Sequence, residues 1–318
     1  MDVDGAEPAR PSIGGRPRVQ PDDIDPSTCG GLTDLVGPSA DVVDIDGAVE
    51  LAPGRPDAGL TPLVLIPPLF GDQAMADARS LVRHLDPGRR VLLLDLQGRS
   101  GRAVPIDTMD GLTAFYLDQL RAAISTGPVV LAGHSLGGAL ALEVARRLDP
   151  FASAARRPEG RPAELLSPEQ ASGPTVEVVV MFDSRVSDDE AARWLTVAKR
   201  PFRRARQAMR SRRGTVDIGA EVKAATSRAW LSYRPRPYAG RVVYLAARGV
   251  DGRPETMRRD QRWAPVLAAI EVHEVPGGHS GSGSLLDEPH VAATVAVLQQ
   301  ALLSPDPAER LGPRLDPG

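Results

Sequence analysis

The sequence predicts an α/β protein in which a mostly parallel sheet carries helices on both faces. Short runs rich in Val, Ile and Leu recur along the chain with little polar alternation, as in strands that are buried on both faces. Amphipathic segments with helical spacing separate most of these runs. Strands that alternate with helices favour a parallel sheet, because each crossover helix packs on one face of it.

The individual elements follow from where these runs and segments begin and end. The predicted strands are Pro62–Leu69, Arg90–Leu96, Pro128–Gly133, Val176–Phe182, Gly240–Ala247 and Ile270–Val275. The predicted helices are Gln73–Leu85, Met109–Ile124, Leu136–Leu148, Leu195–Arg212, Val216–Leu231 and Pro289–Leu302.

Two segments interrupt the alternation. An insertion rich in Pro, Ala, Glu and Arg occupies residues 150–173, and we interpret it as a loop at the rim of the sheet. Residues 184–237 hold helical patterns and no strand, which is too long for a simple crossover. We interpret this second segment as a helical lid over the active edge of the sheet.

The predicted α/β domain spans residues 60–304. Residues 1–59 contain scattered Pro, Gly and Asp with weak periodicity, which is typical of a flexible leader or linker, with one short strand expected near Asp41–Leu51. Residues 305–318 form a Pro-rich tail. A chain of 318 residues allows about two domains, although α/β folds often run longer as one unit.

Composition excludes several classes of protein. With 42% hydrophobic and 25% charged residues, the chain resembles ordinary globular proteins, and its net charge of −3 gives no reason to expect nucleic acid or a membrane surface as a partner. Cys29 is the only cysteine, so no intramolecular disulfide can form. The acidic N-terminus lacks a secretory signal, and no run of about 18 apolar residues could span a membrane. We expect a cytoplasmic protein.

The central motif is Gly133-His134-Ser135-Leu136-Gly137. The strand-like run PVVLAG precedes it and the helical pattern GGALALEVARRL follows it. In a nucleophile elbow, the serine lies on a sharp turn between strand and helix, and the glycines leave room where the two nearly touch. The motif in this context is typical of the α/β-hydrolase fold and predicts Ser135 as a nucleophile.

A serine hydroxyl is a weak nucleophile that needs a base, and in this fold the order along the chain is Ser, then Asp or Glu, then His. His279 follows a predicted strand in the turn Val275-Pro276-Gly277-Gly278-His279, which places it on the same sheet edge as Ser135. The other histidines end a helix, lie inside the elbow, lie within a strand and begin the last helix. They are His84, His134, His273 and His290.

Two carboxylates fit the position of the acid. Asp183 ends the strand VEVVVMFD, and Asp251 follows the next strand, so chain order allows either. Asp95 also ends a strand, but it precedes the serine, and we interpret it as structural.

An oxyanion hole needs two backbone N–H groups. One should belong to Leu136, directly after the nucleophile. The other should come from the loop Pro67-Pro68-Leu69-Phe70-Gly71, where the prolines have no N–H and Leu69 is the natural donor.

Several segments, in order, resemble one family. LVLIPPLFG, GPVVLAGHSLGGALALEVARRL, VVVMFDS, AWLSYRPRPYAGRVVYLAA and EVHEVPGGHSG look like the thioesterase domains that end non-ribosomal peptide and polyketide assembly lines. The resemblance covers about Leu60 to Leu303 and implies Asp183 as the acid, since terminal-domain members carry it after the strand that follows the elbow helix. Stand-alone editing members tend to use the position that matches Asp251. The insertion at 150–173 is long for the family.

The resemblance implies a reaction and a partner. The substrate would be an acyl, peptidyl or polyketide chain held as a thioester on the phosphopantetheine arm of an acyl or peptidyl carrier protein. Release would occur through an acyl-Ser135 intermediate, by hydrolysis or by cyclisation, with no metal or organic cofactor. Alternative hypotheses for the function are an esterase or lipase of small free esters, a stand-alone editing thioesterase and a non-catalytic binding protein. A dehydrogenase is disfavoured because IPPLFG replaces a GxGxxG turn.

A basic run lies within the predicted lid. It comprises Lys199, Arg200, Arg203, Arg204, Arg206, Arg210, Arg212 and Arg213. It is either a solvated helix face in an arginine-rich protein or a docking surface for an acidic carrier protein or for the phosphate of its arm. Because Arg203, Arg206 and Arg210 follow helical spacing, they would form a partial stripe.

Overall fold

The described part of the protein comprises a β-sheet and five α-helices. In this computed structural model the described residues are 43–45, 47–68, 71–96, 105–149, 173–186, 218–249, 262–281 and 283–304. All of them belong to one compact unit, Ala40–Gly318. The predicted helix Leu195–Arg212, the basic run, the tail at 305–318 and nearly all of the insertion at 150–173 lie outside the described residues.

Within the described ranges, one eight-stranded sheet organises this unit, with the strand order β1-β2-β4-β3-β5-β6-β7-β8. The strands from β3 to β8 are parallel, and β1 and β2 extend one edge in the antiparallel sense. The strands are β1 (Val43–Ile45), β2 (Ala48–Ala52), β3 (Leu63–Ile66), β4 (Val91–Leu94), β5 (Gly127–His134), β6 (Pro174–Phe182), β7 (Tyr238–Ala247) and β8 (Leu267–Val275).

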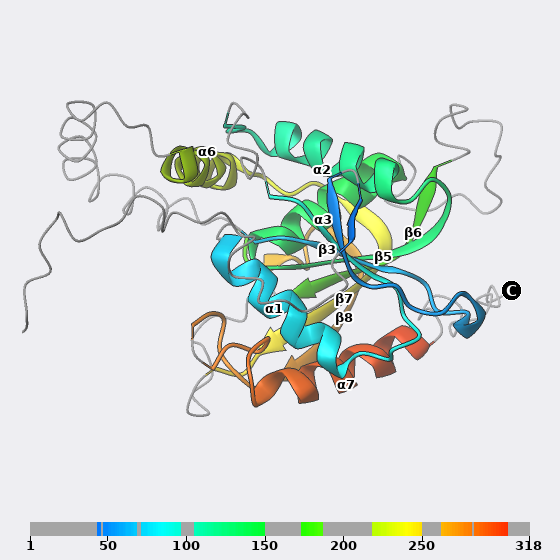
Figure 1. Ribbon diagram of the computed structural model, residues 1–318. Helices are drawn as coiled ribbons and strands as arrows, with labels where there is room; N and C mark the ends of the chain where they lie inside the picture. The colour runs from blue at the N-terminus through cyan, green and yellow to red at the C-terminus, as the bar shows by residue number, and fades with distance from the viewer. Residues whose placement is uncertain are drawn as a thin grey trace, which may run out of the picture. The chain divides into compact units, whose positions relative to one another are not determined.

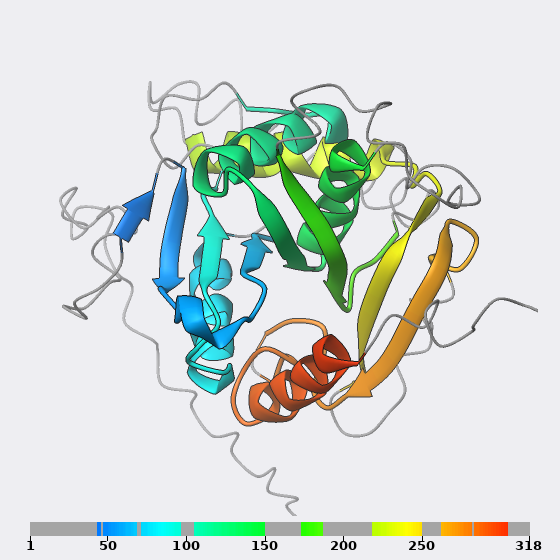
Figure 2. The same cartoon turned by 90° about the vertical axis from the view of Figure 1, so that its right-hand side faces the viewer.

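Helices cover both faces of the sheet. The helices α1 and α7 pack together on one face, and α2, α3 and α6 lie on the other (Figures 1 and 2). They are α1 (Gly71–His84), α2 (Met109–Ala123), α3 (Leu136–Leu148), α6 (Ile218–Ser232) and α7 (His290–Leu303). The result is a three-layer α/β arrangement with the central strands buried from both sides.

The continuous apolar runs are explained by this burial. In β3, Val64 and Ile66 pack toward α2 and α3, while Leu63 and Leu65 pack toward α1 and α7. Successive side chains of a strand point to opposite faces, so a strand with a hydrophobic layer on each side has no position that favours a polar residue. Full burial of such a side chain contributes about 1.5–3 kcal/mol.

The structure contains all six predicted strands and five of the six predicted helices, with ends shifted by a few residues. The short strand expected near Asp41–Leu51 is a hairpin of two strands, β1 and β2, and β2 pairs with β4. The sheet therefore begins before residue 60, where the sequence placed the start of the domain. Of the predicted lid at 184–237, the described helix α6 packs against α2 in the layer on the sheet, and residues 187–217 lie outside the described part.

A buried charged cluster ties α3 to the segment that follows α6. Glu143 is 2% exposed and accepts a hydrogen bond of 2.9 Å from the Tyr233 hydroxyl. Its other carboxylate oxygen accepts bonds from Arg146 and Arg236, at 3.0 and 2.9 Å. Burial, and then the neighbouring Glu143, raise the pKa of Tyr233 well above its usual value, so Tyr233 remains a donor.

Among the helices of the described ranges, none combines the length and apolar character that crossing a membrane requires.

The burial pattern generates a stability prediction. Leu131 lies on β5 with no exposed surface, so Leu131→Ala should lower the free energy of unfolding by about 2–5 kcal/mol. Leu303 is 75% exposed, and Leu303→Ala should stay within about 0.5 kcal/mol of the wild type. Urea unfolding of the two variants checks this. Similar losses for both would contradict the assignment of the core.

Candidate active site

A sharp turn at Ser135 connects β5 to α3. Ser135 is the one residue between the strand and the helix, with φ 56° and ψ −117°, a conformation that a non-glycine residue rarely adopts. Its backbone N–H donates to the carbonyl of Phe182 at the end of β6, at 3.1 Å. The sheet thus holds Ser135 in a strained turn at the carboxyl edge of β5, as the sequence predicted for an elbow.

The glycines of the motif permit the close approach of strand and helix. A side chain at Gly133 would collide with the backbone of Gly137 and Gly138, and a side chain at Gly137 would collide with the carbonyl of Ile66. These obstacles are backbone atoms, which cannot rotate away. The glycines are therefore needed for space at both positions.

Asp183 occupies the corresponding place one strand further along the sheet. It follows β6 directly, is 2% exposed and also has a positive φ, of 44°. Its backbone N–H donates to Leu245 of β7 at 2.9 Å, and its Oδ1 accepts from the N–H of Ala247 at 3.3 Å. Hydrogen bonds to β7 at both ends of the residue fix the direction of the carboxylate.

His279 bridges Asp183 and Ser135. Its Nδ1 lies 2.7 Å from Asp183 Oδ2, and its Nε2 lies 3.1 Å from Ser135 Oγ. A neutral imidazole that donates from Nδ1 to the carboxylate leaves Nε2 free of hydrogen, in a position to accept the serine proton. Neighbouring backbone bonds, from Gly249 to Gly277 and between Gly278 and Gly283, hold the loop that carries His279.

Three of the other histidines have different surroundings. His84 Nε2 lies 2.8 Å from Glu288 Oε1. His273 lies on β8, 3.9 Å from Glu271, and the backbone N–H of His290 donates to Asp287 at the start of α7. None of these contacts involves Ser135.

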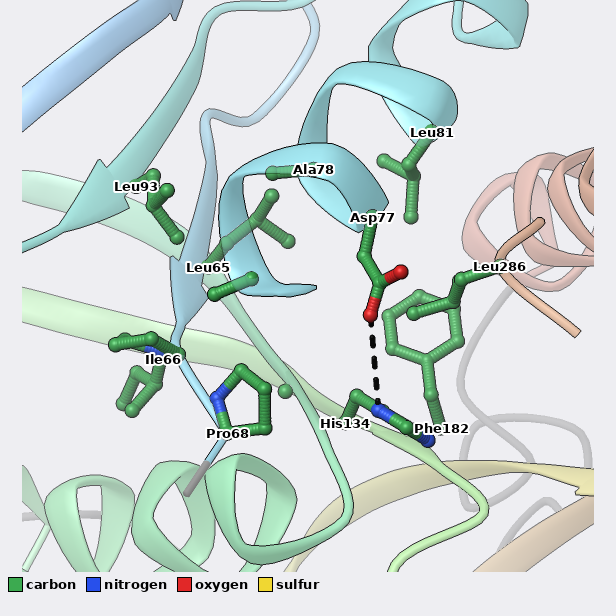
Figure 3. Close-up of a pocket in the computed structure, with 13 residues that line it drawn as sticks. Leu65, Ile66, Pro68, Asp77, Ala78, Leu81, Leu93, His134, Phe182 and Leu286 are labelled. Carbon is green, nitrogen blue, oxygen red and sulfur yellow. Dashed lines mark ion pairs between the residues drawn. The ribbon is translucent and has the colours of Figure 1, made fainter. Parts of the chain in front are cut away.

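The ring of His134 lies beside that of His279. Its ring centroid is 4.9 Å from that of His279, and its Nδ1 lies 3.9 Å from Asp77 Oδ2 of α1. Figure 3 shows Asp77 and His134 facing each other in a pocket. The other side chains that line this pocket are apolar, among them Leu65, Leu81 and Phe182. Sequence reasoning missed Asp77. The available signal was a carboxylate on the apolar stripe of α1, between the buried residues Ala74 and Leu81.

Of the two predicted oxyanion donors, Leu136 lies within the described residues and Leu69 does not. Leu136 is the first residue of α3, where backbone N–H groups have no acceptor within the helix and the helix dipole favours negative charge. Leu69 and the alternative acid Asp251 lie outside the described residues. Among the described side chains, no group of three or more His, Cys, Asp or Glu residues could hold a metal ion.

Comparisons with known sequences point to one family. Residues 61–157 match the model of the thioesterase domain family. Over 96 residues, 29% of this chain, the protein is 38% identical to the non-reducing polyketide synthase men2 of Menisporopsis theobromae. Over 214 residues, 63% of this chain, it is 25% identical to malpibaldin synthetase of Mortierella alpina. The matches span only 4% and 3% of those two proteins.

Solved structures give the same fold. The NocB thioesterase domain, in covalent complex with a fluorophosphonate nocardicin G analogue, has a TM-score of 0.52 at 23% identity, over 79% of this chain and 98% of that one. The Vlm2 thioesterase domain, bound with a dodecadepsipeptide, has a TM-score of 0.53 at 16% identity, over 80% and 97%. The four-domain non-ribosomal peptide synthetase AB3403 has a TM-score of 0.57 at 18% identity, over 82% of this chain and 20% of that one.

The protein therefore has the α/β-hydrolase fold, and its predicted resemblance to the thioesterase domains of non-ribosomal peptide and polyketide synthases is confirmed.

The close approach at the elbow generates a prediction. Gly→Ala inside a helix normally stabilises by about 1 kcal/mol, but Gly137→Ala in α3 should lower the free energy of unfolding by about 1–3 kcal/mol, because the methyl group meets the Ile66 carbonyl. Gly219 is exposed in α6, so Gly219→Ala should leave stability unchanged or slightly raised. Denaturant unfolding distinguishes the two, and a stabilised Gly137→Ala variant would refute the packing argument.

Proposed function

We propose that the protein is a serine thioesterase that releases an acyl, peptidyl or polyketide chain from a carrier protein. The observation that carries the proposal is the continuous contact from Asp183 through His279 to Ser135, at 2.7 and 3.1 Å. Nucleophile, base and orienting acid in hydrogen-bond reach of one another are the arrangement that activates a serine hydroxyl. The match to the thioesterase domain family supports a thioester as the bond attacked.

In the first half-reaction, Ser135 Oγ attacks the thioester carbonyl while His279 Nε2 takes its proton. Asp183 keeps the imidazole in the tautomer that accepts at Nε2 and stabilises the positive charge that develops on the ring. The N–H groups of Leu136 and Leu69 would donate to the oxyanion, aided by the N-terminus of α3. The C–S bond then breaks, and the departing thiolate takes the proton from His279.

In the second half-reaction, the acyl-serine ester is attacked by water or by an amine or hydroxyl of the acyl chain itself. His279 removes a proton from that nucleophile and returns it to Ser135 Oγ as the ester bond breaks. Water gives hydrolysis and an internal nucleophile gives cyclisation. Both routes use the same three residues and need no metal or organic cofactor.

The proposed partner is an acyl or peptidyl carrier protein that presents the substrate on its phosphopantetheine arm. The proteins that contain similar domains support this partner. The matched sequences are a polyketide synthase and a synthetase, and one similar structure is a multidomain peptide synthetase.

Ser135→Ala should abolish turnover of an acyl thioester while leaving the fold intact, because alanine removes only the hydroxyl from the elbow. Intact-mass measurement after mixing with the thioester should show an acyl adduct on the wild type alone. An adduct that persists in Ser135→Ala would remove Ser135 from the mechanism. Faster turnover of short free esters than of carrier-bound thioesters would favour an esterase instead.

Asp183→Asn should reduce kcat by roughly 10⁴-fold, because an amide favours the wrong tautomer of His279. Asp251→Asn, the matched change at the other acid that chain order allows, should have a far smaller effect. Steady-state kinetics of both variants on one thioester compare them directly. A larger loss in Asp251→Asn would reverse the assignment of the acid.

A further inference from the structure

The residue after the proposed acid is held by two buried side chains. The carbonyl oxygen of Ser184 accepts a hydrogen bond of 2.7 Å from the Tyr244 hydroxyl and one of 3.0 Å from Trp263 Nε1. Ser184, Tyr244 and Trp263 have no exposed surface. We call this pair of hydrogen bonds the Ser184 clamp.

The clamp joins three parts of the chain. Tyr244 comes from β7, Trp263 comes from the segment before β8, and Ser184 follows β6. A carbonyl oxygen has two lone pairs, and both are used here. The side chain of Ser184 lies against Gly138 of α3, where an added methyl group would collide with the Ser184 hydroxyl. Ser184 is thus held by hydrogen bonds at its carbonyl, and its side chain packs against α3.

Asp183 depends on such fixation. A positive φ of 44° places it in a conformation that costs a non-glycine residue free energy and persists only where the surroundings over-determine it. Its N–H is bonded to β7, so its backbone is held on one side by Leu245 and on the other by the Ser184 clamp. Release of the following residue would let Asp183 relax toward a negative φ, which would turn its carboxylate away from His279.

We propose that Tyr244 and Trp263 are positioning residues for the reaction, which act through the Ser184 carbonyl to keep the Asp183 carboxylate on His279 Nδ1. This role rests on the proposed function, because it assigns a task within the same catalytic centre. Neither side chain touches the reacting atoms. Their contribution is to orient the acid and, through it, the imidazole that accepts the serine proton.

Tyr244→Phe tests the proposal, since it removes one donor and keeps the ring. Loss of the partner that orients a metal ligand typically costs about 10–100-fold in activity, and Tyr244 orients Asp183 in a comparable way. We therefore expect kcat on an acyl thioester to fall at least about tenfold, with KM within about twofold of the wild type. The far-downfield proton NMR signal of the His279 Nδ1–H, bonded to Asp183 in the wild type, should weaken or disappear. Trp263→Phe removes the other donor and should act in the same direction.

Tyr233→Phe is the matched control. Its hydroxyl is also buried and donates to Glu143 at 2.9 Å, on α3 and away from the acid. It should lose thermal stability to a similar extent as Tyr244→Phe, yet keep kcat, KM and the Nδ1–H signal. A merely structural hydroxyl at Tyr244 would give the same pattern as this control.

Two results would overturn the proposal. One is a folded Tyr244→Phe or Trp263→Phe protein with wild-type kcat and an intact Nδ1–H signal. The other is a change confined to KM. Failure of the proposed function would give a different result, in which the wild type does not turn over thioesters and forms no adduct on Ser135. Loss of the Nδ1–H signal in Tyr244→Phe would in that case still support the Ser184 clamp.

Discussion

Two non-glycine residues with positive φ, Ser135 and Asp183, stand at the carboxyl ends of neighbouring parallel strands, and the rest of the site depends on them. In the register of β5 and β6, His134 lies beside Phe182, so the next residue of each strand emerges at the same height. Adjacent strands are about 4.8 Å apart, a gap that one imidazole ring can bridge with a hydrogen bond at each end. The sheet, and not the loops, sets the spacing of Ser135 and Asp183.

Each strained turn is tied to the next strand along the sheet. The N–H of Ser135 bonds to β6, and the N–H of Asp183 bonds to β7. Because these strands are buried between two helical layers, they cannot shift to relieve the turns. The packing of the sheet stabilises the fold by more than the strained turns cost, so the turns persist. The same packing buries Asp183 and leaves its carboxylate directed at His279.

Much of this could be predicted from the sequence, because the signals are local. Runs buried on both faces gave the parallel strands, and the elbow motif together with chain order pointed to Ser135 and His279. Chain order could not choose between Asp183 and Asp251, because both follow strands. The hydrogen bonds from Tyr244 and Trp263, and the approach of Asp77 to His134, join segments distant in sequence and leave no periodic trace. The sequence predicts one strand where the structure has the hairpin of β1 and β2, because both strands are too short to give separate signals.

A crystal structure of the protein inactivated by an alkyl fluorophosphonate would test the central claim most directly. The phosphorus atom should be bonded to Ser135 Oγ, with His279 Nδ1 still within hydrogen-bond distance of Asp183 and the Leu136 N–H directed at the phosphoryl oxygen. Phosphorus on another residue, or a His279 ring turned to Asp251, would contradict the account.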